Sequence, residues 1–253
     1  MILAGGFGSR LAEETDKRPK PMVEIGGRPI LWHIMNSYAS HGINDFVVCL
    51  GYQAHYIKKF FLDYSSTLSD FTVDLATQKV SLHKRRLENW KVTLIDTGLH
   101  TMTGGRIKKA FEFLACNETF CLTYGDGLSN VDISASIDFH RKHGKYATVT
   151  AVTPPGRFGI LEIDYQDKVI GFREKIVSDQ YRINGGFFVL EPSVIDYLND
   201  DTTVWEREPL NNLARDGQLK AWNHNGFWHP MDTLRDKNHL ESLWQAGNPP
   251  WTT

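Results

Sequence analysis

Short apolar runs and amphipathic stretches alternate along much of the chain. The apolar runs have the length of buried strands, and they lie at 1–3, 45–50, 90–96, 120–124 and 147–152. The first amphipathic stretch begins at Pro29, the helix-starting position that proline prefers, and its inward residues are Ile30, Leu31, Ile34, Met35 and Tyr38. A second helix is predicted over 54–64, and its expected inward residues are Tyr56, Ile57, Phe60 and Phe61.

This alternation of strand and helix predicts an α/β fold. We expect a Rossmann-like, mixed and mainly parallel sheet that carries helices on both faces. Ligands of such sheets bind where the strands end, at their carboxyl edge. Residues that directly follow the apolar runs are therefore the first candidates for a functional site.

Two regions depart from the alternation. Residues 70–90 alternate like exposed strands and predict a small β-hairpin or flap beside the sheet. Its basic run, Lys84-Arg85-Arg86, is interpreted as a solvated face, although phosphate contact stays open. Residues 190–253 predict a helical C-terminal region, in which one helix is expected over 203–215. Because no linker or internal repeat separates these parts, we expect one domain over residues 1–253.

Size and charge exclude several classes of protein. The chain has 253 residues, 41% hydrophobic and 23% charged, which suits one globular α/β domain. The net charge of −2 argues against a nucleic-acid partner or an anionic membrane surface. The three cysteines, Cys49, Cys116 and Cys121, lack metal-ligand spacing and suggest reduced thiols, so we expect a cytoplasmic protein.

A glycine-rich turn follows the first apolar run. Ala4-Gly5-Gly6-Phe7-Gly8-Ser9-Arg10 lets backbone N–H groups approach phosphate oxygens without Cβ interference. Arg10 and Lys20, which stands between two prolines, can neutralise a triphosphate. The turn is not a Walker loop, and Leu11 occupies the third glycine position of a dinucleotide-binding loop. The alternative is an ordinary strand-to-helix turn with surface cations.

Three further segments carry candidate chemistry, each with a structural alternative. Thr103-Gly104-Gly105-Arg106 opens a helix and offers free N–H groups and a guanidinium to an anion, unless Thr103 is a plain N-cap. Asp126 follows a buried strand between two glycines and can bind Mg²⁺, or it is a turn residue that caps the next helix. Asp232 precedes the last helix, where an N-cap is the strong alternative.

The order of these motifs resembles the sugar-1-phosphate nucleotidyltransferases, the nucleotide-sugar pyrophosphorylases. Leu-Ala-Gly-Gly-x-Gly-x-Arg-Leu followed by Pro-Lys-Pro-Met is similar to the family's nucleotide-binding signature. The Thr-Gly-Gly-Arg, Gly-Asp-Gly, Glu-Lys, Asn-Gly-Gly and Pro-Met-Asp-Thr segments follow in family order, nearly end to end. The form Met102-Thr103-Gly104-Gly105-Arg106 resembles the cytidylyltransferase branch.

The resemblance implies a role for each matching residue. Nucleotide-binding residues would be Leu3, Ala4, Gly5, Gly6, Phe7, Gly8, Ser9, Arg10, Lys20, Thr101, Arg106 and Gly125. Sugar-phosphate-binding residues would be Glu174, Lys175, Asn184 and Gly185. Mg²⁺ would be held by Asp126 and Asp232, and the catalytic cations would be Arg10, Lys20 and Lys175.

The implied reaction transfers a cytidylyl group from CTP to α-D-glucose 1-phosphate, which gives CDP-glucose and pyrophosphate. A thymidylyl- or uridylyltransferase stays open, as does a non-catalytic nucleotide-sensing protein of the same fold. The resemblance also implies a homo-oligomer, trimer or hexamer, in the synthesis of O-antigen and other lipopolysaccharide sugars. Family members have a few more residues before the first strand, so we expect residues to precede Met1 and to add stability.

Overall fold

The computed structural model describes residues 1–83, 87–114, 118–154, 160–166, 168–173 and 181–252. In this part of the chain, a seven-stranded sheet of order β14-β10-β13-β8-β1-β4-β7 forms the centre. Its strands are β1 (Ile2–Leu3), β4 (Asp45–Leu50), β7 (Lys91–Asp96), β8 (Phe120–Tyr124), β10 (Ala147–Val152), β13 (Ile183–Leu190) and β14 (Leu219–His224).

The sheet is mixed and mainly parallel, as predicted. β1 pairs in parallel with β4 and with β8, β4 with β7, and β10 with β14. β13 runs antiparallel to both of its neighbours, β10 and β8. The beginning of β13 therefore lies at the same edge as the ends of the other strands.

Alternate residues of the central strands enter two separate hydrophobic clusters. In β4, Phe46, Val48 and Leu50 belong to one cluster, whereas Val47 and Cys49 belong to the other. Because successive side chains of a strand point to opposite faces, both faces of the sheet are buried. This explains why these strands read as continuous apolar runs in the sequence.

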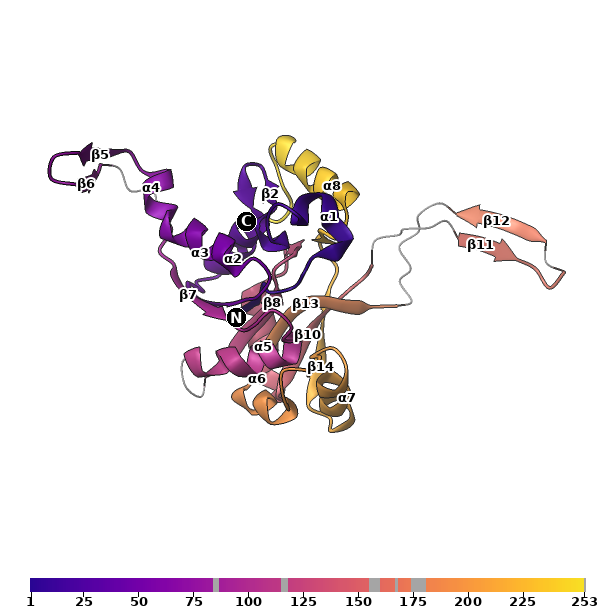
Figure 1. Ribbon diagram of the computed structural model, residues 1–253. Helices are drawn as coiled ribbons and strands as arrows, with labels where there is room; N and C mark the ends of the chain where they lie inside the picture. Colours follow the sequence, from indigo (N-terminus) through magenta and orange to yellow (C-terminus); the bar gives the residue numbers. More distant parts are fainter. Residues whose placement is uncertain (84–86, 115–117, 155–159, 167, 174–180, 253) are drawn as a thin grey trace.

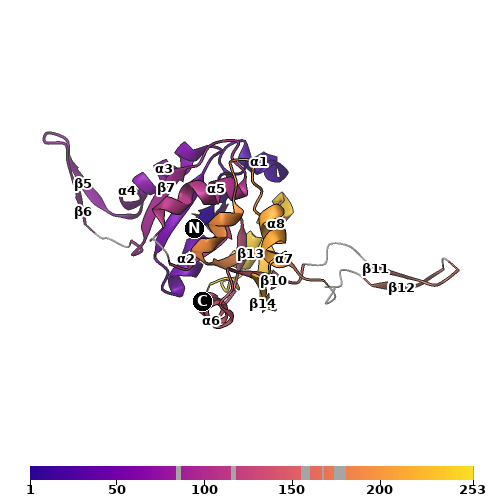
Figure 2. The ribbon, with the colours of Figure 1, turned by 90° about the horizontal axis from the view of Figure 1, so that it is seen from below.

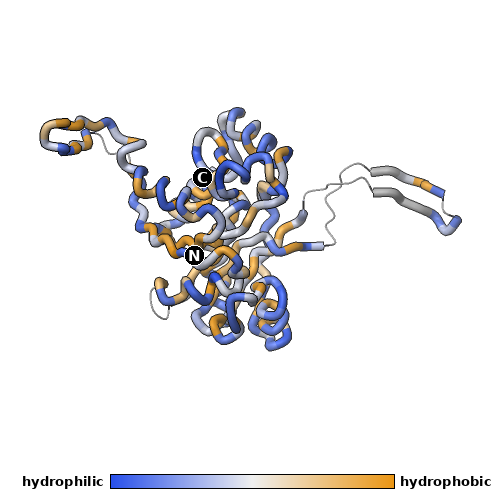
Figure 3. Tube along the Cα trace, in the orientation of Figure 1, coloured by the Kyte–Doolittle hydropathy of each residue, from blue (hydrophilic) through white to orange (hydrophobic). Residues whose placement is uncertain are grey.

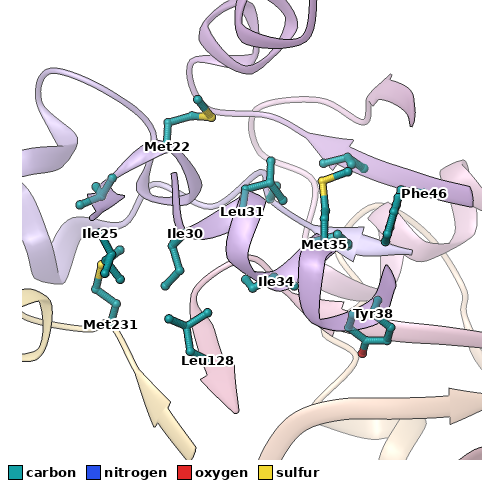
Figure 4. Close-up of a cluster of buried hydrophobic side chains, with 14 of the residues drawn as sticks. Met22, Ile25, Ile30, Leu31, Ile34, Met35, Tyr38, Phe46, Leu128 and Met231 are labelled. Atoms are coloured by element: carbon teal, nitrogen blue, oxygen red, sulfur yellow. The ribbon is translucent and has the colours of Figure 1, made fainter. Parts of the chain in front are cut away.

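Helices cover the two faces of the sheet. They are α1 (Ala12–Thr15), α2 (Ile30–Ser40), α3 (Ala54–Leu62), α4 (Tyr64–Leu68), α5 (Thr103–Ala110), α6 (Ile133–His143), α7 (Glu208–Arg215) and α8 (Leu234–Gln245). The apolar face of α2 packs around Ile25, Leu128 and Met231 in one core cluster (Figure 4). In the second cluster, Ile107 of α5 and Leu213 of α7 are fully buried.

Short two-stranded sheets complete the fold. They pair β2 (Glu24–Ile25) with β3 (Arg28–Pro29), β5 (Phe71–Asp74) with β6 (Lys79–Leu82), β9 (Gly127–Ser129) with β15 (Trp228–Pro230), and β11 (Ile160–Ile163) with β12 (Val169–Arg173). The β5–β6 hairpin, the predicted flap, and the β11–β12 hairpin project from opposite sides of the body (Figures 1 and 2). The predicted basic run 84–86 lies outside the described residues.

Some local expectations are wrong. Tyr56 was expected inward, but this residue is 39% exposed. The buried residues of α3 are Ala54 and Ile57. The helix expected from Thr203 begins only at Glu208. Among the described helices, none combines the length and apolar character that a membrane span needs.

Candidate active site

A cleft of about 700 Å³ lies at the carboxyl edge of the parallel strands. The loop after β1 and the turn after β8 line it, and so do the beginning of β13 and the start of α5. These segments are far apart in sequence, but strand order places β1, β8 and β13 side by side. The cleft is therefore where the fold brings the predicted motifs together.

The glycine loop is shaped by close contacts that exclude a Cβ. Gly8 has a φ of 66°, and a Cβ there would lie 2.8 Å from the Thr15 side chain. A Cβ at Gly5 would lie 2.1 Å from Nη1 of Arg106. Leu11, which replaces the third glycine of a dinucleotide loop, is fully buried and anchors the loop to the core.

Lys20 joins two carboxylates on the floor of the cleft. Its Nζ lies 2.6 Å from Oδ2 of Asp126 and 2.9 Å from Oδ1 of Asp232. Arg10 reaches the other oxygen of Asp232, with Nη1 2.8 Å from Oδ2. Lys20 is only 7% exposed, and a buried ammonium needs such partners. The four residues therefore form one charge cluster beside the glycine loop.

Strand pairing sets the two carboxylates next to each other. β15 pairs antiparallel with β9, with Pro230 opposite Gly127, and the Met231 N–H donates to the Asp126 carbonyl at 2.8 Å. The sequence left open that the two aspartates cap the helices that follow them, but other residues are the caps. Thr233 caps α8 in a capping box with Asp236, and Asp132 caps α6 through the Ala135 N–H at 2.8 Å.

The donor set suits Mg²⁺ in combination with substrate phosphates. Among the described residues, no group of three or more His, Cys, Asp or Glu converges into a metal site. However, Mg²⁺ is commonly bound by one or two carboxylates together with phosphate oxygens of the substrate. The convergence of Asp126 and Asp232 on a single ammonium shows that both carboxylates reach one point. The residues present therefore fit such an ion.

The start of α5 differs from both sequence-based interpretations. The N–H groups of Gly104 and Gly105 donate to the Thr203 carbonyl at 2.9 Å and 3.3 Å, so they are not free for an anion. Thr103 is not the N-cap either, because the residue in that position is Met102. The Thr103 hydroxyl instead accepts from the Trp205 N–H at 2.9 Å.

Arg106 lines the cleft, but its guanidinium is engaged with the protein. Nη1 donates to the Leu50 carbonyl at 2.8 Å and to Thr97 Oγ1 at 2.7 Å, and Nη2 donates to the Gly5 carbonyl at 3.1 Å. The side chain is buried, and this burial lowers the pKa of the guanidinium. Arg106 thus braces the loops after β1, β4 and β7, and nucleotide contact by this residue stays a prediction.

The remaining predicted residues divide into two groups. Leu3, Ala4, Gly6, Phe7, Ser9, Thr101, Gly125, Asn184 and Gly185 line the cleft. The hydroxyl of Thr101 already donates to the Thr97 carbonyl at 2.7 Å. Glu174 and Lys175 lie outside the described residues, so their expected contacts with the sugar phosphate stay predictions.

Sequence reasoning missed Tyr124, Glu206 and Trp228, which also line the cleft. Tyr124 is the last residue of β8, directly before Gly125 and Asp126, and that position was a usable signal. Glu206 carried no signal, because its segment was interpreted as an ordinary helix. Trp228 donates from Nε1 to the Gly185 carbonyl at 2.7 Å, a contact that needs the tertiary structure.

Two of the thiols expected to be reduced are described. Cys49 and Cys121 are free, and burial raises their pKa to about 12 and about 11. Both therefore stay protonated at neutral pH and are poor nucleophiles. Cys116 lies outside the described residues.

Comparisons with known proteins agree on the family. Residues 1–214 match the nucleotidyl transferase family. The glucose-1-phosphate cytidylyltransferase of Salmonella typhi is 55% identical over 253 residues, 100% of this chain and 98% of the relative. A probable glucose-1-phosphate cytidylyltransferase of Bacillus subtilis is 44% identical over 252 residues, 99% of this chain and 98% of the relative.

The fold is shared with a solved structure. HddC from Yersinia pseudotuberculosis superposes with a TM-score of 0.70 at 25% sequence identity, and the match covers 96% of this chain and 97% of that chain. These findings confirm the resemblance drawn from the motifs and the Rossmann-type architecture drawn from the strand pattern. The chain therefore belongs to the nucleotidyl transferase family of enzymes.

Proposed function

We propose that the chain transfers the cytidylyl group of CTP to α-D-glucose 1-phosphate and releases pyrophosphate and CDP-glucose. The observation that carries the chemistry is the Lys20 ammonium, which joins Asp126 and Asp232 beside the glycine loop. The choice of CTP and glucose 1-phosphate is supported by 55% identity, over the full chain, to a relative of that name. Neither relative supports a thymidylyl- or uridylyltransferase.

The reaction is a phosphoryl-type displacement at the α-phosphorus. A phosphate oxygen of glucose 1-phosphate forms the new bond, and the bond from the α-phosphorus to the bridging oxygen of pyrophosphate breaks. Because the attacking phosphate is already anionic, the protein need not supply a general base. Its contributions are alignment of the two substrates and stabilisation of negative charge.

This chain's own residues can perform both tasks. Backbone N–H groups of the glycine loop would orient the triphosphate. Arg10, whose side chain is 70% exposed at the mouth of the cleft, and the buried Lys20 would stabilise charge on the α-phosphate and the departing pyrophosphate. The expected role of Lys175 at the sugar phosphate completes the set, although that residue lies outside the described part of the chain.

Asp126 and Asp232 would hold the Mg²⁺ that the family resemblance implies. When bound, the ion would neutralise phosphate charge and template the two substrates. Lys20 contacts both carboxylates, so the cluster keeps one cation between them in this structure. The Lys20 ammonium therefore compensates the negative charge of both closely spaced carboxylates.

Setting and assembly are proposals of the same kind. We expect the enzyme to work in the cytoplasm and to supply CDP-linked sugars for lipopolysaccharide O-antigen. A homo-oligomer, trimer or hexamer, is supported by exposed apolar residues on the projecting β5–β6 hairpin (Figure 3), namely Phe71, Val73, Leu75 and Val80. Light scattering of the purified protein measures the number of subunits.

A pyrophosphate-release screen tests the proposal. Each nucleoside triphosphate is combined with several sugar 1-phosphates, with Mg²⁺ or with EDTA. We expect release with CTP, glucose 1-phosphate and Mg²⁺ together. Preference for UTP or dTTP would overturn the choice of nucleotide. Nucleotide binding without any release would favour the non-catalytic sensor.

A further inference from the structure

A row of hydrogen-bonded polar groups crosses the wall of the cleft. The Asn184 Nδ2 lies 3.4 Å from the Tyr124 hydroxyl, which donates to Oε1 of Glu206. The Thr103 hydroxyl donates to Oε2 of Glu206 at 2.7 Å. All four residues line the cleft, although β13, β8, the 206 turn and α5 supply them separately. Glu206 is the negative charge at the centre of this row.

Buried neighbours hold the row in place. Trp205, next to Glu206, is fully buried, and its backbone N–H donates to the same Thr103 hydroxyl at 2.9 Å. The Tyr124 ring packs so closely on Gly186 that a Cβ there would lie 2.6 Å from it. A carboxylate fixed from two sides is preorganised, which lowers the entropy cost of binding a ligand.

The row still has capacity to bind a ligand. A carboxylate oxygen has about two lone-pair sites, and each oxygen of Glu206 accepts one hydrogen bond from a hydroxyl. Burial and the neighbouring Glu206 charge raise the pKa of Tyr124 well above its ordinary value, so its phenol stays a donor. The exposed Glu206 carboxylate therefore presents acceptors to the cleft.

The position of the row argues for the uncharged, hydroxyl-bearing part of a ligand. Arg10 and Lys20 follow β1, whereas Tyr124 and Asn184 belong to β8 and β13, on the other side of β1 from β4. A carboxylate repels phosphates but accepts well from hydroxyls. The cationic side of the cleft thus suits the triphosphate, and the row suits a sugar ring.

We propose that Glu206 accepts a hydrogen bond from a ring hydroxyl of the hexose 1-phosphate and so determines which sugar the enzyme uses. This inference rests on the proposed function, because it assigns the sugar subsite of that reaction. Tyr124 and Thr103 are positioning residues, since they hold the carboxylate and reach the sugar through it.

The test compares wild-type enzyme with Glu206→Gln in steady-state kinetics. The amide keeps the shape of the side chain but loses the charge and one acceptor oxygen. We expect the KM for glucose 1-phosphate to rise about tenfold or more, because a hydrogen bond to a charged acceptor is lost. The KM for CTP should stay within about twofold, since the proposal assigns the triphosphate to the cationic side of the cleft and Glu206 to the sugar. Glu208→Gln, two residues on in the first turn of α7, is the matched control.

Deoxy analogues of glucose 1-phosphate separate a direct contact from a structural effect. The penalty of Glu206→Gln should vanish for the one analogue that lacks the contacted hydroxyl. An equal penalty for every analogue, a rise in the KM for CTP instead, or no change would each overturn the proposal. If Glu206→Gln fails to fold, Tyr124→Phe replaces it. The rise in KM that Tyr124→Phe causes must then also vanish for the analogue that lacks the contacted hydroxyl. Failure of the wild-type enzyme to use CTP with glucose 1-phosphate would refute the proposed function separately.

Discussion

The Lys20 ammonium lies 2.6 Å from Asp126 Oδ2, although 106 positions separate the two residues in the sequence. The same ammonium contacts Asp232, which is 212 positions away. The buried cation and the two carboxylates compensate one another's charge, so removing any one of them would leave an uncompensated charge at this site.

Lys20→Met is expected to lower turnover on the order of a hundredfold or more, as the loss of one charge-stabilising group does in comparable sites. The physical reason is that the variant leaves the triphosphate without its buried cation. Pyrophosphate release at saturating substrates measures the effect. Lys17→Met, at an exposed lysine three positions earlier, is the control and should keep normal turnover. Near-normal turnover of Lys20→Met would contradict the assigned role.

Asp126→Asn and Asp232→Asn are expected to weaken Mg²⁺ activation. Each amide removes one negative charge from a hard-cation site, so the Mg²⁺ concentration for half-maximal activity should rise by about tenfold or more. Mg²⁺ titration of pyrophosphate release gives this value. Asp132→Asn is the matched control, because Asp132 caps α6 and asparagine is an equally good N-cap. Equal Mg²⁺ dependence in all three variants would remove both aspartates from the metal site.

Arg106→Met should destabilise the fold. The variant removes the guanidinium hydrogen bonds to the Leu50 and Gly5 carbonyls, and each lost bond costs about 0.5–1.5 kcal/mol. Both carbonyls keep a second donor, the N–H groups of Thr97 and Tyr52. Urea unfolding in the absence of ligands measures the loss. Lys108→Met on the same helix should cost less than about 1 kcal/mol, because Lys108 is exposed and water can replace its hydrogen bonds to the Leu198 and Asn199 carbonyls. A stable Arg106→Met that lost only nucleotide affinity would instead make Arg106 a ligand contact.

A buried histidine network predicts a dependence of stability on pH. His140 lies 2.8 Å from Thr148 Oγ1 through Nδ1 and 3.0 Å from Glu191 Oε1 through Nε2, and His143 lies 2.7 Å from the same hydroxyl. The Lys145 N–H donates to Nδ1 of His143 at 2.9 Å. This donor makes Nδ1 of His143 an acceptor, so Nε2–H of His143 donates to Thr148. The Thr148 hydroxyl then donates to His140. Both rings are neutral in this arrangement.

Burial lowers the pKa of His140, and burial together with His140 and nearby lysines lowers that of His143. An unfolded histidine, with a pKa of about 6.5, therefore binds protons that the folded one does not. Their stabilising contribution is complete above about pH 6.5 and is lost as the pH falls through the lower folded values. Each histidine changes the free energy of unfolding by at most about 1.4 kcal/mol per pH unit.

Urea midpoints between pH 5 and 7.5 measure this dependence. His140→Gln should be less stable at neutral pH but should lose less stability on acidification than the wild-type protein. His55→Gln, at an exposed position, should follow the wild-type slope. An unchanged slope in His140→Gln would mean that the network does not control the acid response.

Much of the architecture was predictable because its signals are local. The apolar runs mark the buried strands, since a strand that is buried on both faces must be apolar at successive positions. The glycine loop was recognisable because Gly8 and Gly5 occupy positions where a Cβ does not fit. The antiparallel direction of β13 had no local signal, because strand direction depends on the connections and partners of the strand.

The sequence by itself determined the kinds of groups at the site: a glycine loop, cations, carboxylates and an amide. Only the tertiary structure decided which donor meets which acceptor. Thr203, far along the chain, supplies the carbonyl that occupies the N–H groups of Gly104 and Gly105, and Leu50 and Gly5 engage Arg106. Such pairings join residues brought together by strand order, and a hydrogen bond depends on distance in space rather than on spacing in the chain.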